Sequence, residues 1–262
     1  MADGKAQVML EQALGPGRAD ADGPQILPVG IDSLLVRLSL TVQPWTTGAV
    51  QLLSRNLRDR FGDRLVSVHP SLTSVLVKLA DPAERERVAG ETETVLAEVS
   101  WETATAPPAT RIWEIPVAFG GDNGPDLTEA AALAGLSPDQ AVDELLATST
   151  RVLAVGFAPG QPYLGPLPER WNLPRMTELN PMVPRGALAV AVRQIVLFAN
   201  KSPTGWRQVA RCAFQVFQPQ AETPAPLCAG DEVRLIRASD EEMDRLLNSG
   251  DVMGGARCLG AP

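Results

Sequence analysis

The single histidine, His69, restricts the acid–base chemistry that this chain could perform. A Ser-His-Asp or Cys-His arrangement would need His69, and a metal site with several histidine ligands is impossible within one chain. Proton transfer would depend on carboxylates, lysines, the single tyrosine Tyr163, His69 or a partner subunit. The cysteines, Cys212, Cys228 and Cys258, have no CxxC spacing and predict buried thiols, with no metal site and no disulfide framework.

A stretch rich in glycine and proline, Gly156–Trp171, is where side chains could gather around a ligand. Glycine lets a backbone pass close to a ligand, and proline fixes its path. Tyr163 offers a hydroxyl from an otherwise apolar loop. The alternative is an ordered loop that only covers one end of its domain.

A second polar group follows in Ser202–Gly205, which has the form of a tight turn. Ser202 and the neighbouring amides could bind a carboxylate or phosphate oxygen; the alternative is a plain hairpin turn. We expect Trp206 to fill the core rather than stack on a ligand. The Gln194 amide could pair with a carboxylate or an amide.

Three cations near these segments, Arg185, Arg193 and Lys201, could complete an anion site; the alternative for each is a solvated surface charge. The candidate substrate-binding residues are Phe157, Pro159, Gly160, Tyr163, Leu164, Arg185, Arg193, Gln194, Lys201, Ser202, Gly205 and Trp206.

Composition limits the classes of protein to consider. Hydrophobic residues make up 45% of the 262 residues, which is enough for packed cores. The net charge of −8 argues against a nucleic-acid partner. No apolar run approaches a membrane span, and residues 1–25, an expected mobile tail, show no signal-peptide pattern. We therefore expect a cytoplasmic protein with no membrane association.

The elements that must position these residues begin with a small α/β sandwich over 26–102. A helix over 47–61 carries Leu53 and Leu57 on its apolar stripe, and Gly62 ends it.

Strands are predicted over 33–40 and 74–79. Asp81, Pro82 and Glu84 then predict the start of a second helix with capping-box spacing.

A Pro/Ala/Thr-rich linker, 103–110, separates this domain from a β-barrel over 111–238, and 239–262 form a C-terminal tail. Asp126 and Ser137 are expected to cap two helices of the barrel domain, and Gln140 lies at capping-box spacing from Ser137. The predicted barrel strands are 111–119, 151–157, 187–199, 208–217 and 231–237.

Five motifs occur in order along the chain: IPVAFGGDNGPDL, GFAPGQPYLGPLPERW, VPRGALAV, SPTGWRQVAR and PLCAGDEVRL. Together they resemble the KipI-like family, which includes the small subunit of 5-oxoprolinase and allophanate hydrolase subunit 1 and corresponds to carboxyltransferase subdomains C and D. The resemblance covers residues 26–237 and indicates a divergent member.

The resemblance implies an α+β fold in which a small N-terminal α/β sandwich precedes a C-terminal cyclophilin-like β-barrel. It implies a heteromer with a larger paralogous barrel subunit and a small amide or carboxylate substrate. No cofactor would be covalently bound, and ATP would act through the complex. It adds Asp126 to the candidate catalytic residues, which are then Gln194, Ser202, Tyr163 and Asp126.

Several positions depart from the family pattern. A histidine is usual near Leu145, phenylalanine at Gln161, tyrosine at Phe198 and glycine at Thr204. In the family, small residues and glycines usually lead into a Gln-Thr pair at this point. Here residues 189–195 read AVAVRQI instead. These changes cluster on the expected pocket, so the ligand or the reaction could differ from the family's.

Three functions therefore remain open. The first is the small subunit of an ATP-dependent lactam or amide hydrolase. The second is a non-catalytic regulator of the histidine-kinase-inhibitor type. The third is a cyclase or lyase of specialised metabolism on the same scaffold.

Overall fold

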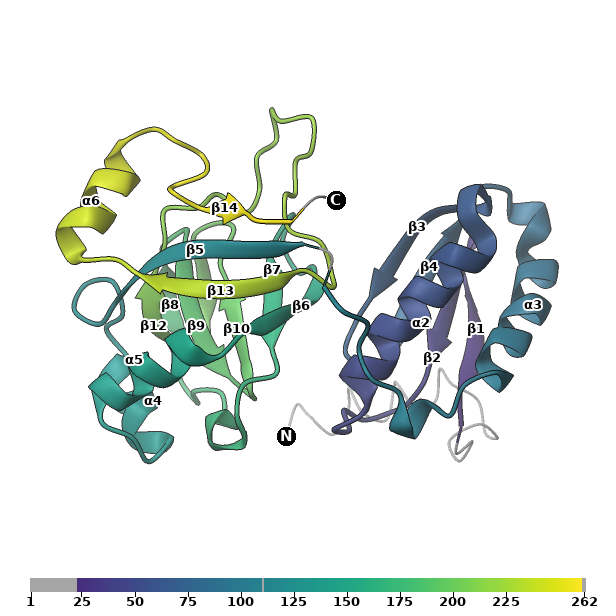
Figure 1. Cartoon of the computed structure of the whole chain (residues 1–262), viewed down its shortest axis with the longest axis horizontal. Helices are drawn as coiled ribbons and strands as arrows, with labels where there is room; N and C mark the ends of the chain where they lie inside the picture. The colour runs from purple at the N-terminus through teal and green to yellow at the C-terminus, as the bar shows by residue number, and fades with distance from the viewer. Residues whose placement is uncertain (1–22, 110, 261–262) are drawn as a thin grey trace.

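The computed structural model describes residues 23–109 and 111–260. Two domains lie side by side, a small α/β domain and a larger barrel (Figure 1). Of the expected tail, 1–25, residues 1–22 lie outside the described ranges. Gln25 is already the first residue of a strand. No helix in the described ranges is long and apolar enough to cross a membrane.

The N-terminal domain is a four-stranded antiparallel sheet with two helices on one face (Figure 1). Its strand order is β1-β2-β4-β3. The elements are β1 (Gln25–Val29), β2 (Ser33–Arg37), α2 (Thr46–Phe61), β3 (Leu65–Pro70), β4 (Ser74–Leu79) and α3 (Arg85–Ala97). The α2 stripe is buried as predicted, because Leu53 and Leu57 are fully covered by the sheet. Gly62 ends α2 with φ 49°.

The second helix begins differently from the prediction. Asp81 accepts a hydrogen bond from the Ala83 amide, and one 3₁₀ turn, Pro82–Glu84, precedes α3. Glu84 does not complete a capping box; it forms an ion pair with Arg64, at 2.8 Å.

The linker packs between the domains. A 3₁₀ turn, Trp101–Thr103, begins it, and residue 110 lies outside the described ranges. Gly48 lets the linker backbone approach α2, because a side-chain carbon there would lie 3.1 Å from the Ala106 nitrogen. Arg151 of the barrel donates to the Pro107 carbonyl. Both domains therefore hold the linker in place.

Seven strands form a closed barrel in the order β12-β9-β10-β7-β6-β13-β5, and pairing of β12 with β5 closes it. β5 and β13 are parallel and the other barrel pairs are antiparallel. The strands are β5 (Ile112–Phe119), β6 (Thr150–Val155), β7 (Pro162–Gly165), β9 (Ala187–Ala191), β10 (Gln194–Leu197), β12 (Arg207–Arg211) and β13 (Glu232–Arg237). Helices α4 (Leu127–Leu133) and α5 (Pro138–Ala147) pack against the barrel. The capping box of Ser137 and Gln140 is confirmed.

Two strand predictions and one turn prediction in the barrel domain were wrong. Residues 187–199 form a hairpin of β9 and β10, and its turn holds Val192 and Arg193 at φ 43° and 62°. Ser202–Gly205 is not a tight turn, because β11 (Ser202–Thr204) pairs with β8 (Asn180–Val183). The strand expected over 208–217 ends at Arg211.

The C-terminal segment 239–262 is packed rather than loose up to residue 260. Helix α6 (Asp240–Asn248) buries Met243 against Ala118 and Ala213. Strand β14 (Arg257–Cys258) pairs with the start of β5.

Candidate functional site

A pocket of about 320 Å³ opens beside the barrel, on the outer side of two strands, where Tyr163 and Val196 point away from the core that buries Leu164 and Ile195. It lies between the loop after β6, strands β7 and β10, the segment around Arg175, and the β11–β12 connection. We call it the barrel-mouth pocket. It coincides with the Gly156–Trp206 segment in which ligand chemistry was expected.

One wall of this pocket is aromatic and apolar. The rings of Tyr163 and Trp206 meet edge to face, with centroids 6.1 Å apart and an interplanar angle of 74°. Trp206 packs against Val196 and Phe198 in a buried cluster. The prediction that Trp206 fills the core is confirmed, and the indole also faces the pocket.

Among the described residues, Arg175 is the only charged one that lines this pocket. Its guanidinium carbon lies 5.6 Å from the centroid of the Trp206 ring, and the pairs found over residues 23–260 give it no carboxylate partner. The segment that carries it is fixed, since the Met176 amide donates to the Gly205 carbonyl at 2.7 Å. The pocket therefore presents one unpaired positive charge beside an aromatic face.

Three neutral polar groups complete the lining. The buried Gln161 side chain accepts weakly from the Ala199 amide, at 3.4 Å, which leaves its NH₂ group free for a ligand. The Thr204 hydroxyl accepts from the Trp206 amide at 3.1 Å. The Tyr163 hydroxyl has no hydrogen bond among the described residues. A small ligand with one carboxylate and one amide would match these groups.

Phe157, Tyr163, Gly205 and Trp206 are the predicted residues that the fold brings together at this pocket. Three further lining residues, Gln161, Phe198 and Thr204, had been placed on the expected pocket as departures from the family pattern. The lining residues that were missed are Arg175, Met176, Leu179, Val196 and Pro203. One signal could have found Arg175: it is the only basic residue between Trp171 and Arg185 in a proline-rich stretch.

Other predicted residues of the Gly156–Trp171 loop have structural places. Leu164 is fully buried in the barrel core. Gly160 has φ 70°, and a side-chain carbon there would lie 2.4 Å from the Val216 oxygen, so glycine is needed for packing. Pro159 is exposed and does not line the pocket.

The predicted anion site is not assembled. Arg185 donates to the Gln215 side chain at 3.2 Å and lines a separate cavity. Lys201 is exposed, and the Ser202 hydroxyl donates to the adjacent Pro203 carbonyl at 3.1 Å. Arg193 and Gln194 line a cleft between the two domains instead.

Asp126 does not cap α4 with its side chain, contrary to the prediction. Its carboxylate accepts from the Gln208 amide at 2.8 Å, and its own amide donates to the Gln208 carbonyl at 3.0 Å. Asp126 therefore ties the start of α4 to β12, which is a structural role.

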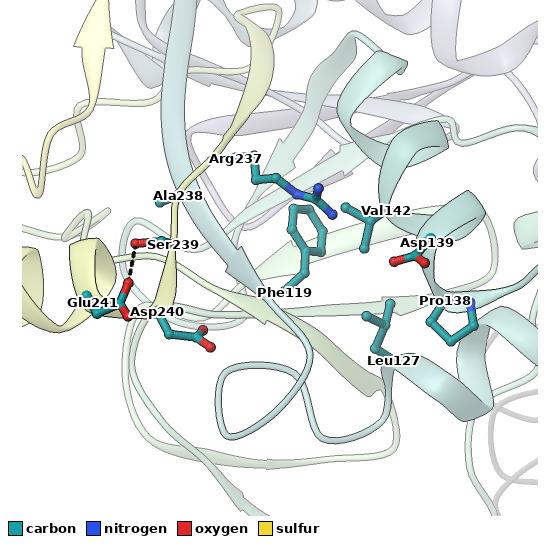
Figure 2. Close-up of a pocket in the computed structure, with 10 residues that line it drawn as sticks. All are labelled: Phe119, Leu127, Pro138, Asp139, Val142, Arg237, Ala238, Ser239, Asp240 and Glu241. Carbon is teal, nitrogen blue, oxygen red and sulfur yellow. Dashed lines mark hydrogen bonds between the residues drawn. The ribbon is translucent and has the colours of Figure 1, made fainter.

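A cavity of about 640 Å³ lies away from this segment, between α4, α5 and the start of α6. Figure 2 shows Asp139 and Asp240 pointing into it from opposite sides, with Phe119 between them and Arg237 above. None of the predicted site residues lines it.

The remaining reactive side chains lie outside the barrel-mouth pocket. His69 is exposed on β3 of the N-terminal domain. Cys212 is buried as expected, and burial raises the pKa of its thiol to about 12. Cys228 and Cys258 are exposed, so the prediction of buried thiols was wrong for these two.

A small α/β domain followed by a seven-stranded barrel defines a two-domain α+β protein. The family described as carboxyltransferase domain, subdomain C and D, matches residues 24–227, and the chain belongs to this family. This confirms the resemblance seen in the five motifs.

Two relatives are named as the same subunit of 5-oxoprolinase. The protein of Bacillus subtilis (strain 168) is 29% identical over 231 residues, which cover 83% of this chain and 94% of the relative. The protein of Escherichia coli O157:H7 is 33% identical over 199 residues, which cover 75% of this chain and 90% of the relative.

Solved structures agree on the fold. TTHA0988 is 28% identical with a TM-score of 0.62; the match covers 80% of this chain and 40% of TTHA0988. The Kluyveromyces lactis urea carboxylase is 15% identical with a TM-score of 0.64; the match covers 94% of this chain and 25% of that protein. The second likeness concerns the fold alone.

Proposed function

We propose that this chain is the small subunit of a heteromeric, ATP-dependent hydrolase that opens a small cyclic amide of the 5-oxoproline type. The observation that carries the proposal is the unpaired Arg175 beside the aromatic wall of the barrel-mouth pocket. The relatives named as 5-oxoprolinase subunits support it.

Each group of the pocket would have a separate task. Arg175 would bind the carboxylate of the substrate, because a guanidinium forms strong charge-assisted hydrogen bonds with carboxylates. The Trp206 face would hold the ring, and the Gln161 amide would donate to the lactam oxygen. Hydrolysis adds water across the lactam C–N bond, which yields an amine and a second carboxylate.

The chain would not complete this reaction alone. Tyr163 and Arg175 are the only titratable residues of the described chain that line the pocket, so the nucleophile and ATP would be supplied through the larger, paralogous barrel subunit. Such a complex would be cytoplasmic, where ATP is available.

Exposed apolar side chains near the pocket support a partner that covers this face of the barrel domain. Phe157 is 83% exposed at φ 69°, and Leu179 and Met182 are 67% and 59% exposed. A bulky residue in the left-handed region is strained, and its exposure costs further free energy. A partner subunit that covers Phe157 would remove this cost.

Co-expression with the larger subunit tests the proposal. We expect the two chains to purify together and, once the third subunit that the family resemblance implies is added, to convert 5-oxoproline to glutamate only with ATP. Arg175→Ala should raise KM roughly tenfold or more, because a charge-assisted hydrogen bond is lost. Arg185→Ala is the matched control, since Arg185 lies away from the pocket, and should leave KM unchanged.

The outcomes separate the functions left open by the sequence. A stable complex with no turnover, together with binding to a histidine-kinase domain, would support a regulator. Turnover of another substrate by the isolated chain would support a repurposed cyclase or lyase. Either result would overturn the hydrolase proposal.

A further inference from the structure

A second cleft, of about 440 Å³, lies between the two domains. The N-terminal domain contributes Gln43, Pro44 and Thr47 from the start of α2, and the barrel contributes Leu153 and Pro166. A neighbouring cavity of about 270 Å³ is lined by Pro44, Thr47, Leu153 and Pro166 as well, so the two are continuous. We call this space the interdomain cleft.

The interdomain cleft contains a side-chain amide that opens into the cavity. Gln194 is 9% exposed and lines the cleft, yet its side chain makes no hydrogen bond within the described ranges. Neither polar atom of this carboxamide is sealed from the cleft, so a ligand can replace solvent there and form hydrogen bonds with both atoms. A carboxamide held open toward a cavity is therefore available to a ligand.

The turn that presents Gln194 is fixed in position. The Arg193 amide donates to the Trp171 carbonyl at 2.9 Å, and its Nε donates to the Leu167 carbonyl at 3.0 Å. Its guanidinium also pairs with Glu169 at 2.5 Å. Gln194 is thus presented by a rigid element, which lowers the entropic cost of binding.

The same ion pair determines the charge of the ligand. Within the described ranges, the larger part of the cleft is lined by two charged residues, Arg193 and Glu169, which neutralise each other. Its other polar groups are the amides of Gln43, Asn172 and Gln194 and the hydroxyl of Thr47. The smaller part adds Arg151, whose guanidinium donates to the Pro107 and Gly230 carbonyls. A charged ligand beside Gln194 would therefore find no unpaired counter-charge in the larger part, whereas the barrel-mouth pocket offers Arg175 to an anion.

We propose that the interdomain cleft is a second ligand site, for a small neutral planar molecule with an adjacent N–H donor and acceptor. The Gln194 carboxamide pairs with both groups at once, as it does with any amide-type edge. Pro44, Leu153 and Pro166 contact the apolar faces of the ring. An uncharged lactam and a nucleobase share this edge chemistry. The proposal is independent of the function proposed for the barrel-mouth pocket.

Titration of the full chain tests the site with two neutral probes, 2-pyrrolidone and adenosine, at up to ~10 mM with binding followed by NMR. Binding of either probe to the wild type is expected, and the one that binds identifies the ligand as a lactam or a nucleobase. Gln194→Ala should weaken it about tenfold, because the paired hydrogen bonds are lost. Gln194→Glu, which keeps the shape but replaces the NH₂ donor with a charge, should weaken it similarly.

Gln220→Ala is the matched control, because Gln220 is exposed in a distant loop. This variant should bind the probes as tightly as the wild type does. Arg175→Ala should also leave the affinity for the probes unchanged. Failure of this proposal can therefore be distinguished from failure of the function proposed for the barrel-mouth pocket. Absence of binding by both probes would overturn the proposal. So would binding to Gln194→Ala or Gln194→Glu with wild-type affinity.

Discussion

The rings of Tyr163 and Trp206 meet edge to face, with the two planes at 74°. The contact joins β7 to the start of β12 across the barrel-mouth pocket. The phenol ring therefore stabilises the pocket wall, while its hydroxyl, unpaired within the described residues, remains free for a ligand.

Tyr163→Phe separates these two roles. The ring contact is kept, so the free energy of unfolding should change by less than about 0.5 kcal/mol. Tyr163→Ala should cost about 2 kcal/mol, because it removes ring burial and the aromatic contact. Urea unfolding gives both values. A loss of 5-oxoproline binding in Tyr163→Phe, at unchanged stability, would assign that loss to the hydroxyl.

Asp126→Ala should destabilise the protein by about 2 kcal/mol, because the buried Gln208 amide then has no acceptor. Asp126→Asn keeps an acceptor oxygen and should cost less. Ser137→Ala, which removes the capping box of the neighbouring helix, is the control and should cost about 1 kcal/mol. Thermal unfolding of the three variants ranks them. A cost for Asp126→Ala no larger than that for Asp126→Asn would contradict the assigned contact.

Val192→Gly should stabilise the protein by about 1 kcal/mol, since glycine adopts φ 43° without strain and a β-branched residue does not. Val66→Gly is the control: Val66 is exposed on β3, where glycine should destabilise by about 0.5–1 kcal/mol. Opposite signs in urea unfolding are the expected result. Destabilisation by both variants would mean that Val192 contributes more through contacts than it loses through strain.

Thiol labelling at pH 7.5 should modify two cysteines quickly in the native protein. Cys228 and Cys258 are exposed, whereas Cys212 is 1% exposed with a pKa raised to about 12 and has almost no thiolate. The third thiol should react only in denaturant. Mass spectrometry of the Cys228→Ser and Cys258→Ser variants, each with one native label, would confirm the assignment. Labelling of Cys212 in the folded state would refute it.

Local signals predicted both helices and two of the four strands of the N-terminal domain, and both helices that pack on the barrel. The apolar stripe on α2 and the capping box at Ser137 depend on residues close in sequence, and both occur. The turn at Val192 and Arg193 was missed because neither residue favours positive φ. Tertiary pairing with β8 and β9 decides the conformation there and at Ser202, and no local pattern encodes it.

The candidate site was predicted in location but not in composition. The aromatic wall could be anticipated from Tyr163 and Trp206, whose types indicate burial with a polar edge. Arg175 was missed because its segment lacks periodicity. Gln194 was predicted as a binding residue, but the fold turns it toward the other domain. Which cavity a side chain faces depends on the strand register, and a one-residue shift reverses it.

Barrel closure through β5 and β12 has a consequence for how the molecule acquires its structure. Phe119 pairs with Ala210, so roughly ninety residues separate the two strands that complete the ring. Contacts between such distant segments form late, because the chain between them must first be ordered. During synthesis, the N-terminal domain can fold while β5 still lacks its neighbours. Exposed β5 is therefore the segment from which misfolding or aggregation of a truncated chain is expected to begin.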